Sequence, residues 1–278
     1  MGLRIWHQSS TVLKHLPHYE EALRAHIARA VRPDTEVVLH GKVAGTHASG
    51  YPGNDTRYSL LYAMHGLQWI AAAREAQREG YDAIVFANLL SPMIREIRTI
   101  VDIPAIGYGE TAFHLSGLYG RKIGVLLFNI ELQDFIPELM HQSGVGERFA
   151  GIGKAGVSFG DVADSLEHPS RRRAVIDTIV EAGRELSERV GADVIIPGET
   201  PMALLLAIEK VDFMGDAAVI DGIAAAFKTA EMLVDLRKLS GMRPSRRGFF
   251  HSRPEAGRVE EIMQFYGLAD FGSRFHDN

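Results

Sequence analysis

A run of polar side chains follows the first predicted strand, residues 3–6. It contains His7, Ser9, Ser10 and Thr11, which offer an imidazole and three hydroxyl groups. Hydroxyls at a helix start, together with free backbone N–H groups, bind a carboxylate or an imide oxygen. We therefore predict that the three hydroxyl residues bind the substrate and that His7 is a catalytic residue. The alternative is that the run only caps the following helix.

The ends of other predicted strands carry an amide and three carboxylates. Asn88 donates and accepts hydrogen bonds but cannot abstract a proton. We therefore predict that it is a catalytic residue that acts by binding substrate oxygens. Glu199, followed by Thr200, is the candidate general base or water activator, with Thr200 binding substrate. Glu110 and Asp221 are also assigned to substrate binding. The alternatives are that Glu199 is only a helix cap and that the other two acids only hold neighbouring loops.

Four of these side chains also form a candidate metal site. His7, Glu110, Glu199 and Asp221 would supply one imidazole and three carboxylates, a set that suits Zn²⁺ or Mn²⁺. A metal there would activate water and favour hydrolysis of a cyclic amide. Because the chain has no H-x-x-x-H or H-E-x-x-H pair, proton transfer without a cofactor is the other alternative.

Short β-branched runs alternate with longer amphipathic stretches along the chain. The predicted strands are 3–6, 36–40, 83–87, 105–107, 122–128, 194–196 and 217–220. The predicted helices are 13–30, 57–78, 92–101, 132–141, 171–190, 202–210 and 222–239. This alternation predicts an α/β protein with mostly parallel sheets, whose site lies beyond the carboxyl ends of the strands.

The two halves of the chain resemble each other. The segment 82–88, which ends at Asn88, aligns with 193–199, which ends at Glu199, and the same offset of 111 residues separates Glu110 from Asp221. We predict two similar parallel-sheet, flavodoxin-like lobes, related by a pseudo-two-fold, with the active site in the cleft between them. The alternative is that the repeat is a property of the fold without catalytic meaning.

The repeat also predicts the domain organisation. Residues 1–117 and 217–240 form the first lobe, 118–216 the second, and 241–278 a C-terminal extension that wraps the surface or a neighbouring subunit. The segment 46–55 contains His47 and Tyr51 and is either a lid over the substrate or a surface loop. The segment 151–156 has G-x-G-x-x-G spacing, but it follows no convincing strand and is predicted to be a loop.

Composition excludes several classes of function. A net charge of −5 gives no positive field for nucleic acid or an anionic membrane, and no apolar run reaches the ~20 residues of a membrane span. We expect a cytoplasmic homo-oligomer with a small-molecule substrate and no nucleic-acid or membrane partner. The chain has no cysteine, so disulfides, thiolate metal sites and cysteine catalysis are excluded.

Several motifs resemble those of the aspartate/glutamate/hydantoin racemase superfamily. The segment 82–88, followed by "DIPAIGYGE" at 102–110, is similar to the region of hydantoin and allantoin racemases around the first catalytic cysteine and its "IPVIGIGEA" stretch. "GADVIIPGE" at 191–199 resembles the second motif, "VIDG" at 219–222 matches the family's own, and "HQSST" at 7–11 resembles the opening "NPNST". The resemblance runs from about residue 3 to 240.

The resemblance implies an enzyme that needs no cofactor, with Asn88 and Glu199 at the positions of the two catalytic cysteines. Racemisation by two bases needs a titratable group on each face of the substrate, and Asn88 is not one. The resemblance thus favours a small carboxylate or a hydantoin-like cyclic amide as substrate and disfavours a two-base racemase. Isomerisation by a single base, decarboxylation and hydrolysis stay open, as does a protein that only binds a small acid.

Overall fold

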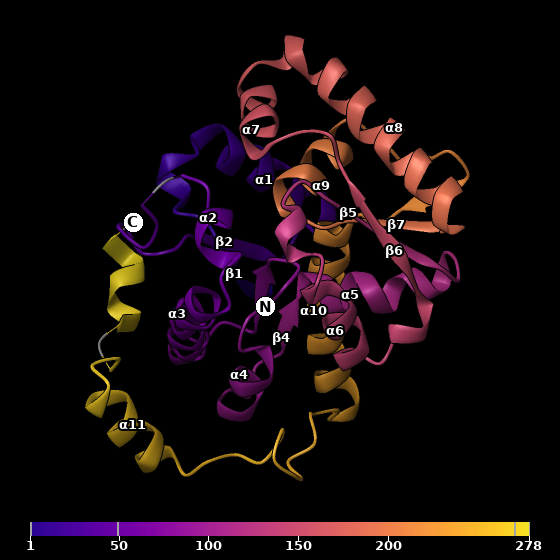
Figure 1. The fold of residues 1–278 in the computed structure, drawn as a ribbon. Coiled ribbons are helices and arrows are strands. Elements are labelled where there is room, and N and C mark those ends of the chain that lie inside the picture. The colour runs from indigo at the N-terminus through magenta and orange to yellow at the C-terminus, as the bar shows by residue number, and fades with distance from the viewer. Residues whose placement is uncertain (1, 49, 270, 278) are drawn as a thin grey trace.

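The computed structural model describes residues 2–48, 50–269 and 271–277. The strands are β1 (Arg4–Ser9), β2 (Glu36–His40), β3 (Ala83–Ala87), β4 (Ala105–Gly107), β5 (Ile123–Leu127), β6 (Phe149–Lys154), β7 (Val194–Pro197), β8 (Phe213–Met214) and β9 (Ala217–Val219). The α-helices are α1 (Pro17–Ala30), α2 (Gly53–Thr56), α3 (Ser59–Arg78), α4 (Ile94–Ile100), α5 (Tyr108–Leu115), α6 (Phe135–Gln142), α7 (Phe159–Glu167), α8 (Arg172–Val190), α9 (Thr200–Ile208), α10 (Gly222–Ser240) and α11 (Ala256–Phe265). Short 3₁₀ helices are η1 (Leu13–His15), η2 (Ser116–Leu118), η3 (Ile130–Leu132), η4 (Gly146–Arg148), η5 (Pro169–Arg171) and η6 (Phe271–Asp277). Figure 1 shows these elements arranged as two sheets flanked by helices, which confirms the predicted α/β fold.

The first sheet is parallel and has the order β2-β1-β3-β4. Every side chain of β3 is buried, as expected for an apolar strand covered by helices on both faces. The register pairs Ser9 of β1 with Ala87 of β3, and Phe86 of β3 with Gly107 of β4. The residues that follow these strands, Ser10 and Asn88 among them, therefore reach the same edge of the sheet.

The second sheet has the order β6-β5-β7-β9-β8 and is parallel except for β8. Leu126 of β5 pairs with Pro197 of β7, so the residues after these two strands also share one edge. That edge carries Phe128 and Asn129 after β5, and Glu199 after β7.

The strand β6 corrects the prediction of a loop at 151–156. Gly151 and Gly153 lie in this strand, where α8 packs closely against it. A Cβ at Gly151 would lie 2.9 Å from the Val190 side chain, and one at Gly153 would lie 3.1 Å from Leu186. Close helix packing thus explains glycines whose spacing imitates a nucleotide-binding motif.

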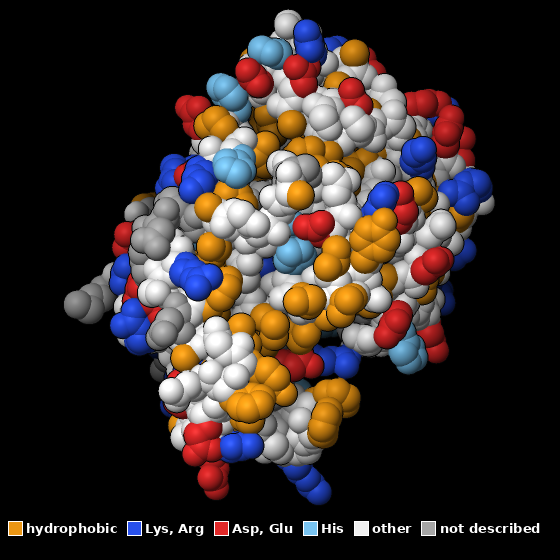
Figure 2. All heavy atoms as spheres, turned by 60° about the vertical axis from the view of Figure 1, so that its left-hand side comes forward, with side chains coloured by type: hydrophobic (Ala, Val, Ile, Leu, Met, Phe, Trp, Pro, Cys, Tyr) orange, Lys and Arg blue, Asp and Glu red, His pale blue; other side chains and the backbone are white. Residues whose placement is uncertain are grey.

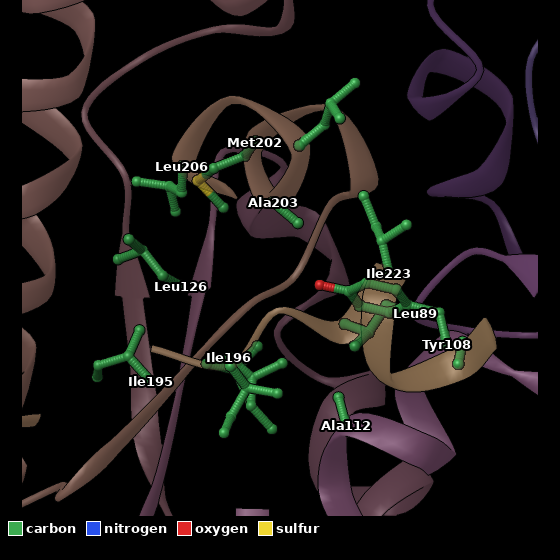
Figure 3. Packing of buried hydrophobic residues seen from close by; sticks show 14 of the residues in the cluster. Leu89, Tyr108, Ala112, Leu126, Ile195, Ile196, Met202, Ala203, Leu206 and Ile223 are labelled. Carbon is green, nitrogen blue, oxygen red and sulfur yellow. The ribbon is translucent and has the colours of Figure 1, made fainter. Parts of the chain in front are cut away.

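A single apolar cluster joins the two sheets. Leu89 and Tyr108 of the first lobe lie near Met202 and Ala203 of α9, and Ile223 of α10 lies beside them (Figure 3). Polar contacts reinforce this union, since the Tyr108 hydroxyl donates to the carbonyl oxygen of Pro197 at 2.7 Å. The two lobes therefore share an apolar core, and packing in that core sets the relative position of the two strand edges.

The boundary between the second lobe and the returning part of the first lobe does not lie at residue 217 as predicted. Strand β9 pairs with β7 and belongs to the second sheet. Helix α10 returns to the first lobe, where it packs against α5, α1 and β3 and runs beside α5 in Figure 1. The crossing between lobes thus falls between β9 and α10.

The C-terminal extension wraps the first lobe of its own chain (Figure 1). Arg246 donates to the carbonyl oxygen of Arg98 at 2.7 Å, and Arg253 pairs with Asp102 at 2.8 Å. Further along, η6 packs against α3, where Phe275 is buried. None of the helices in the described ranges is long and apolar enough to cross a membrane.

The close approach of α5 to the segment after β3 gives a first prediction. A Cβ on Gly109 would lie 2.1 Å from the carbonyl oxygen of Leu89, so we expect Gly109→Ala to destabilise the protein by about 1–3 kcal/mol and to displace Asn88. Urea denaturation measures this change. Gly160→Ala is the matched control, because its Cβ would meet only the Ser158 hydroxyl at 3.5 Å. Equal loss of stability in both variants would contradict the packing argument.

Candidate functional site

A pocket lies where the edges of the two sheets meet. It contains about 560 Å³ of unoccupied space, including the part open to solvent. The first lobe contributes Ser10, Thr11 and Asn88 to its wall, and the second lobe contributes Glu199 and Thr200. The structure therefore brings together five of the residues selected from the sequence.

Glu199 is held by the backbone at the start of α9. One carboxylate oxygen accepts the N–H of Asn129 at 2.9 Å, and the other accepts the N–H of Phe128 at 3.2 Å. Burial raises the pKa of Glu199 to about 7, and these two N–H groups act against that rise. The carboxyl group is therefore fixed in position and exchanges a proton near neutral pH.

The other polar side chains of the pocket that were selected from the sequence are neutral. The Oδ1 atom of Asn88 accepts the Leu90 N–H at 2.7 Å, so the NH₂ group of this amide is the part that can donate to a ligand. Thr11 shares a 2.9 Å hydrogen bond with the hydroxyl of Ser9, which is buried and is not part of the pocket wall. The Thr200 hydroxyl donates to the carbonyl oxygen of Ala87 at 2.8 Å, which ties the two lobes together at the pocket.

Aromatic side chains close one side of the pocket. Tyr51, from the segment between β2 and α2, stacks on Phe159 with 4.7 Å between ring centroids, and Phe128 lies 6.0 Å from Tyr51. Burial and the nearby Glu199 raise the pKa of Tyr51, so its hydroxyl stays protonated. Figure 2 shows hydrophobic side chains across the middle of one face, together with an acidic side chain and a histidine.

Sequence reasoning missed Phe128, Asn129 and Phe159. Phe159 opens α7, whose start is marked by a capping box in which Ser158 and Asp161 cap each other. That S-x-x-D signal could have revealed the helix. Phe128 and Asn129 act through their backbone N–H groups. Because nearly every residue type has such a group, the sequence does not indicate which ones bind Glu199.

His7 lies away from the pocket, because β1 runs to Ser9 and places His7 inside the strand. Its side chain is fully buried and stacks on Phe227, with 6.1 Å between ring centroids. Neither ring nitrogen has a hydrogen-bond partner among the described residues. Burial, with the nearby His40 and Arg24, lowers the pKa of His7 to about 3, so the imidazole is neutral.

The other two predicted acids are engaged elsewhere in the protein. Glu110 pairs with Arg98, whose guanidinium donates to Oε1 at 3.0 Å. Asp221 caps α10 by accepting the N–H of Ala224 at 2.9 Å, and its second oxygen lies 2.9 Å from Nε2 of His26. These contacts correct the predicted metal set, because His7, Glu110 and Asp221 do not share the pocket of Glu199.

A different histidine and carboxylate cluster lies next to the pocket. In the described part of the chain, His47, Asp55 and His65 place one donor atom each within 4.8 Å of one another. Buried Lys42 donates to the carbonyl oxygen of His65, and burial lowers the pKa of this lysine well below its usual range. The cluster is the part of the site best suited to hold a metal ion.

A family model and two related proteins point to the same family. Residues 16–230 match the family model described as Asp/Glu/Hydantoin racemase. The chain is 26% identical over 209 residues to a hydantoin racemase of Pseudomonas sp. (strain NS671), covering 75% of this chain and 78% of that protein. It is 28% identical over 175 residues to a hydantoin racemase of Paenarthrobacter aurescens, covering 63% and 71%.

The fold agrees with this assignment. The structure superposes on an allantoin racemase from Klebsiella pneumoniae with a TM-score of 0.68 and 20% sequence identity, covering 91% of this chain and 94% of the other. The family model covers most of the chain and includes Asn88, Glu199 and Thr200 of the pocket, while Ser10 and Thr11 precede the matched range. The chain therefore belongs to the Asp/Glu/hydantoin racemase family.

Proposed function

We propose that this protein is an isomerase that removes a proton from a carbon atom of a hydantoin-like cyclic amide or a small carboxylate, with Glu199 as its single general base. The observation that carries the proposal is the position and ionisation of Glu199. Its carboxylate lies in the pocket between the lobes, and burial raises its pKa to about 7. A base is most effective when its pKa lies near the working pH.

The geometry around Glu199 supports this role. The N–H groups of Phe128 and Asn129 fix both carboxylate oxygens, so the base is already oriented before the reaction begins. Each oxygen keeps a further lone pair that can accept a proton.

The neutral side chains that the first lobe contributes to the pocket support a mechanism with one base. Asn88 is neutral there, as are Ser10 and Thr11, so they can stabilise a developing enolate oxygen by donating hydrogen bonds. None of them has an ordinary pKa near neutrality, and the chain has no cysteine. Return of the proton by Glu199 to the same face restores the starting enantiomer, so inversion requires that water delivers a proton to the opposite face of the planar enolate.

The names of the relatives support the substrate class. The two curated relatives are hydantoin racemases, and the similar solved structure is an allantoin racemase. A hydantoin ring carries two carbonyl and two N–H groups in one plane, and it matches a pocket that offers amide, hydroxyl and backbone donors beside aromatic rings.

A ligand screen followed by product analysis tests the proposal. We expect hydantoins with one substituent on the carbon that carries the acidic hydrogen to raise the melting temperature, and the protein to interconvert their enantiomers on a chiral column. Small dicarboxylates are screened in parallel. A ligand that stabilises the protein and is recovered unchanged, with its configuration intact, would instead indicate a binding protein. Ring-opened product would indicate a hydrolase.

A further inference from the structure

Two histidines and one aspartate converge beside the pocket. His47 and Asp55 come from the segment between β2 and α3, and His65 lies in α3. The Oδ2 atom of Asp55 lies 2.8 Å from Nδ1 of His47 and 3.2 Å from Nε2 of His65, with 4.7 Å between the two ring centroids. One carboxylate oxygen thus faces two imidazole nitrogens in a partly buried place.

Both ring nitrogens of His47 have a partner in the structure. Its Nδ1 faces the Asp55 carboxylate, and its Nε2 lies 3.1 Å from the carbonyl oxygen of Ser10. Both partners are hydrogen-bond acceptors. A metal ion on Nδ1 would take the place of the contact with Asp55 and leave the Nε2 hydrogen bond to Ser10 in place.

We propose that His47, Asp55 and His65 bind one divalent ion of the Zn²⁺ class through Nδ1, Oδ2 and Nε2. With metal–ligand distances of about 2.0–2.2 Å, neighbouring ligand atoms of a tetrahedral site lie about 3.3–3.5 Å apart. The separations of 2.8 and 3.2 Å are about 0.1–0.7 Å shorter, so the side chains would move apart by that amount to admit the ion.

The surroundings of the cluster resemble those of a metal site. A histidine ligand commonly donates its second N–H to a carbonyl oxygen, as His47 does to Ser10. A small cavity borders the cluster, with His47, His65, Lys42 and Asn88 in its wall.

The ion would fix the wall of the substrate pocket. Ser10, Thr56 and Asn88 line both the pocket and the small cavity, and Tyr51 lies between His47 and Asp55 in the chain. Joining His47 and Asp55 to His65 would anchor the segment of Tyr51 to α3. The proposal concerns binding of the ion and does not depend on Glu199 as a base.

Titration with Co²⁺ tests the site directly. Protein without an affinity tag is treated with chelator, freed of it, and titrated with CoCl₂ while the visible absorption of tetrahedral Co²⁺ is recorded. We expect one Co²⁺ per chain, displacement by one equivalent of Zn²⁺, and a higher melting temperature with Zn²⁺. No stoichiometric Co²⁺ or Zn²⁺ uptake by the wild-type protein at micromolar concentration would overturn the proposal.

Variants separate this site from surface binding and from the catalytic proposal. His47→Gln and His65→Gln should each weaken Co²⁺ binding at least 10–100-fold, since even changes behind the ligands have effects of that size. His168→Gln is the matched control, because His168 is half exposed beside Asp164, and it should bind as the wild type does. Glu199→Gln should also bind normally. Full binding by both His47→Gln and His65→Gln, or by Asp55→Asn if neither folds, would refute the assignment.

Discussion

Replacement of Glu199 by glutamine is expected to lower kcat for isomerisation by about 10²–10⁴-fold, the contribution typical of a positioned general base. Glutamine keeps the size of the side chain but cannot accept the proton from carbon. Because we propose that Ser10 and Asn88 bind the substrate, KM should change much less than kcat. Steady-state kinetics on the substrate found by the ligand screen measures both constants.

A matched control lies at the other end of the same helix. Glu209 follows α9, far from the residues of the pocket, and pairs with Arg172 on the surface. Glu209→Gln should leave kcat within about twofold of the wild type, as expected for a surface change. An equal fall of kcat in both variants would show that disturbance of α9, and not loss of the Glu199 carboxylate, lowers the activity.

The raised pKa of Glu199 predicts how activity depends on pH. The base works only as a carboxylate, so kcat/KM should rise with pH and level off above about 7. At pH 5 the deprotonated fraction, and with it the rate, should be about 100-fold below the plateau. A profile that is already flat at pH 5 would contradict a base with this pKa.

The same group makes stability fall as pH rises. The pKa of Glu199 rises from 4.5 to about 7 on folding, so between these values the folded state binds more protons than the unfolded state. This contribution is present in full below about 4.5 and is lost as the pH approaches 7, with a size of up to about 3 kcal/mol. Urea denaturation of the wild type and Glu199→Gln from pH 5 to 8 measures the difference. Parallel stability curves for the two proteins would exclude the shift.

The sequence predicted the parts of the site that depend on strand ends. β2, β3 and β4 have the predicted bounds, because short apolar or β-branched runs end at turn residues. In parallel sheets such ends share an edge, so Ser10, Asn88 and Glu199 meet in the pocket as expected from their places in the chain.

The parts that were missed depend on contacts between distant residues. His7 was predicted to follow its strand, but β1 is buried on both faces, and such a strand has no alternation to mark where it ends. Glu110 and Asp221 meet Arg98 and His26, and no local pattern indicates these partners. The cluster around Asp55 was also hidden, because its histidines come from two different elements.

Transfer of deuterium from solvent tests the central claim most directly. In D₂O the wild-type protein should place deuterium on the reacting carbon of recovered hydantoin as it interconverts the enantiomers, since the proton held by Glu199 exchanges with water. Glu199→Gln should incorporate deuterium at least 10²-fold more slowly. Deuterium incorporation at the wild-type rate in Glu199→Gln would contradict the assignment of Glu199 as the base.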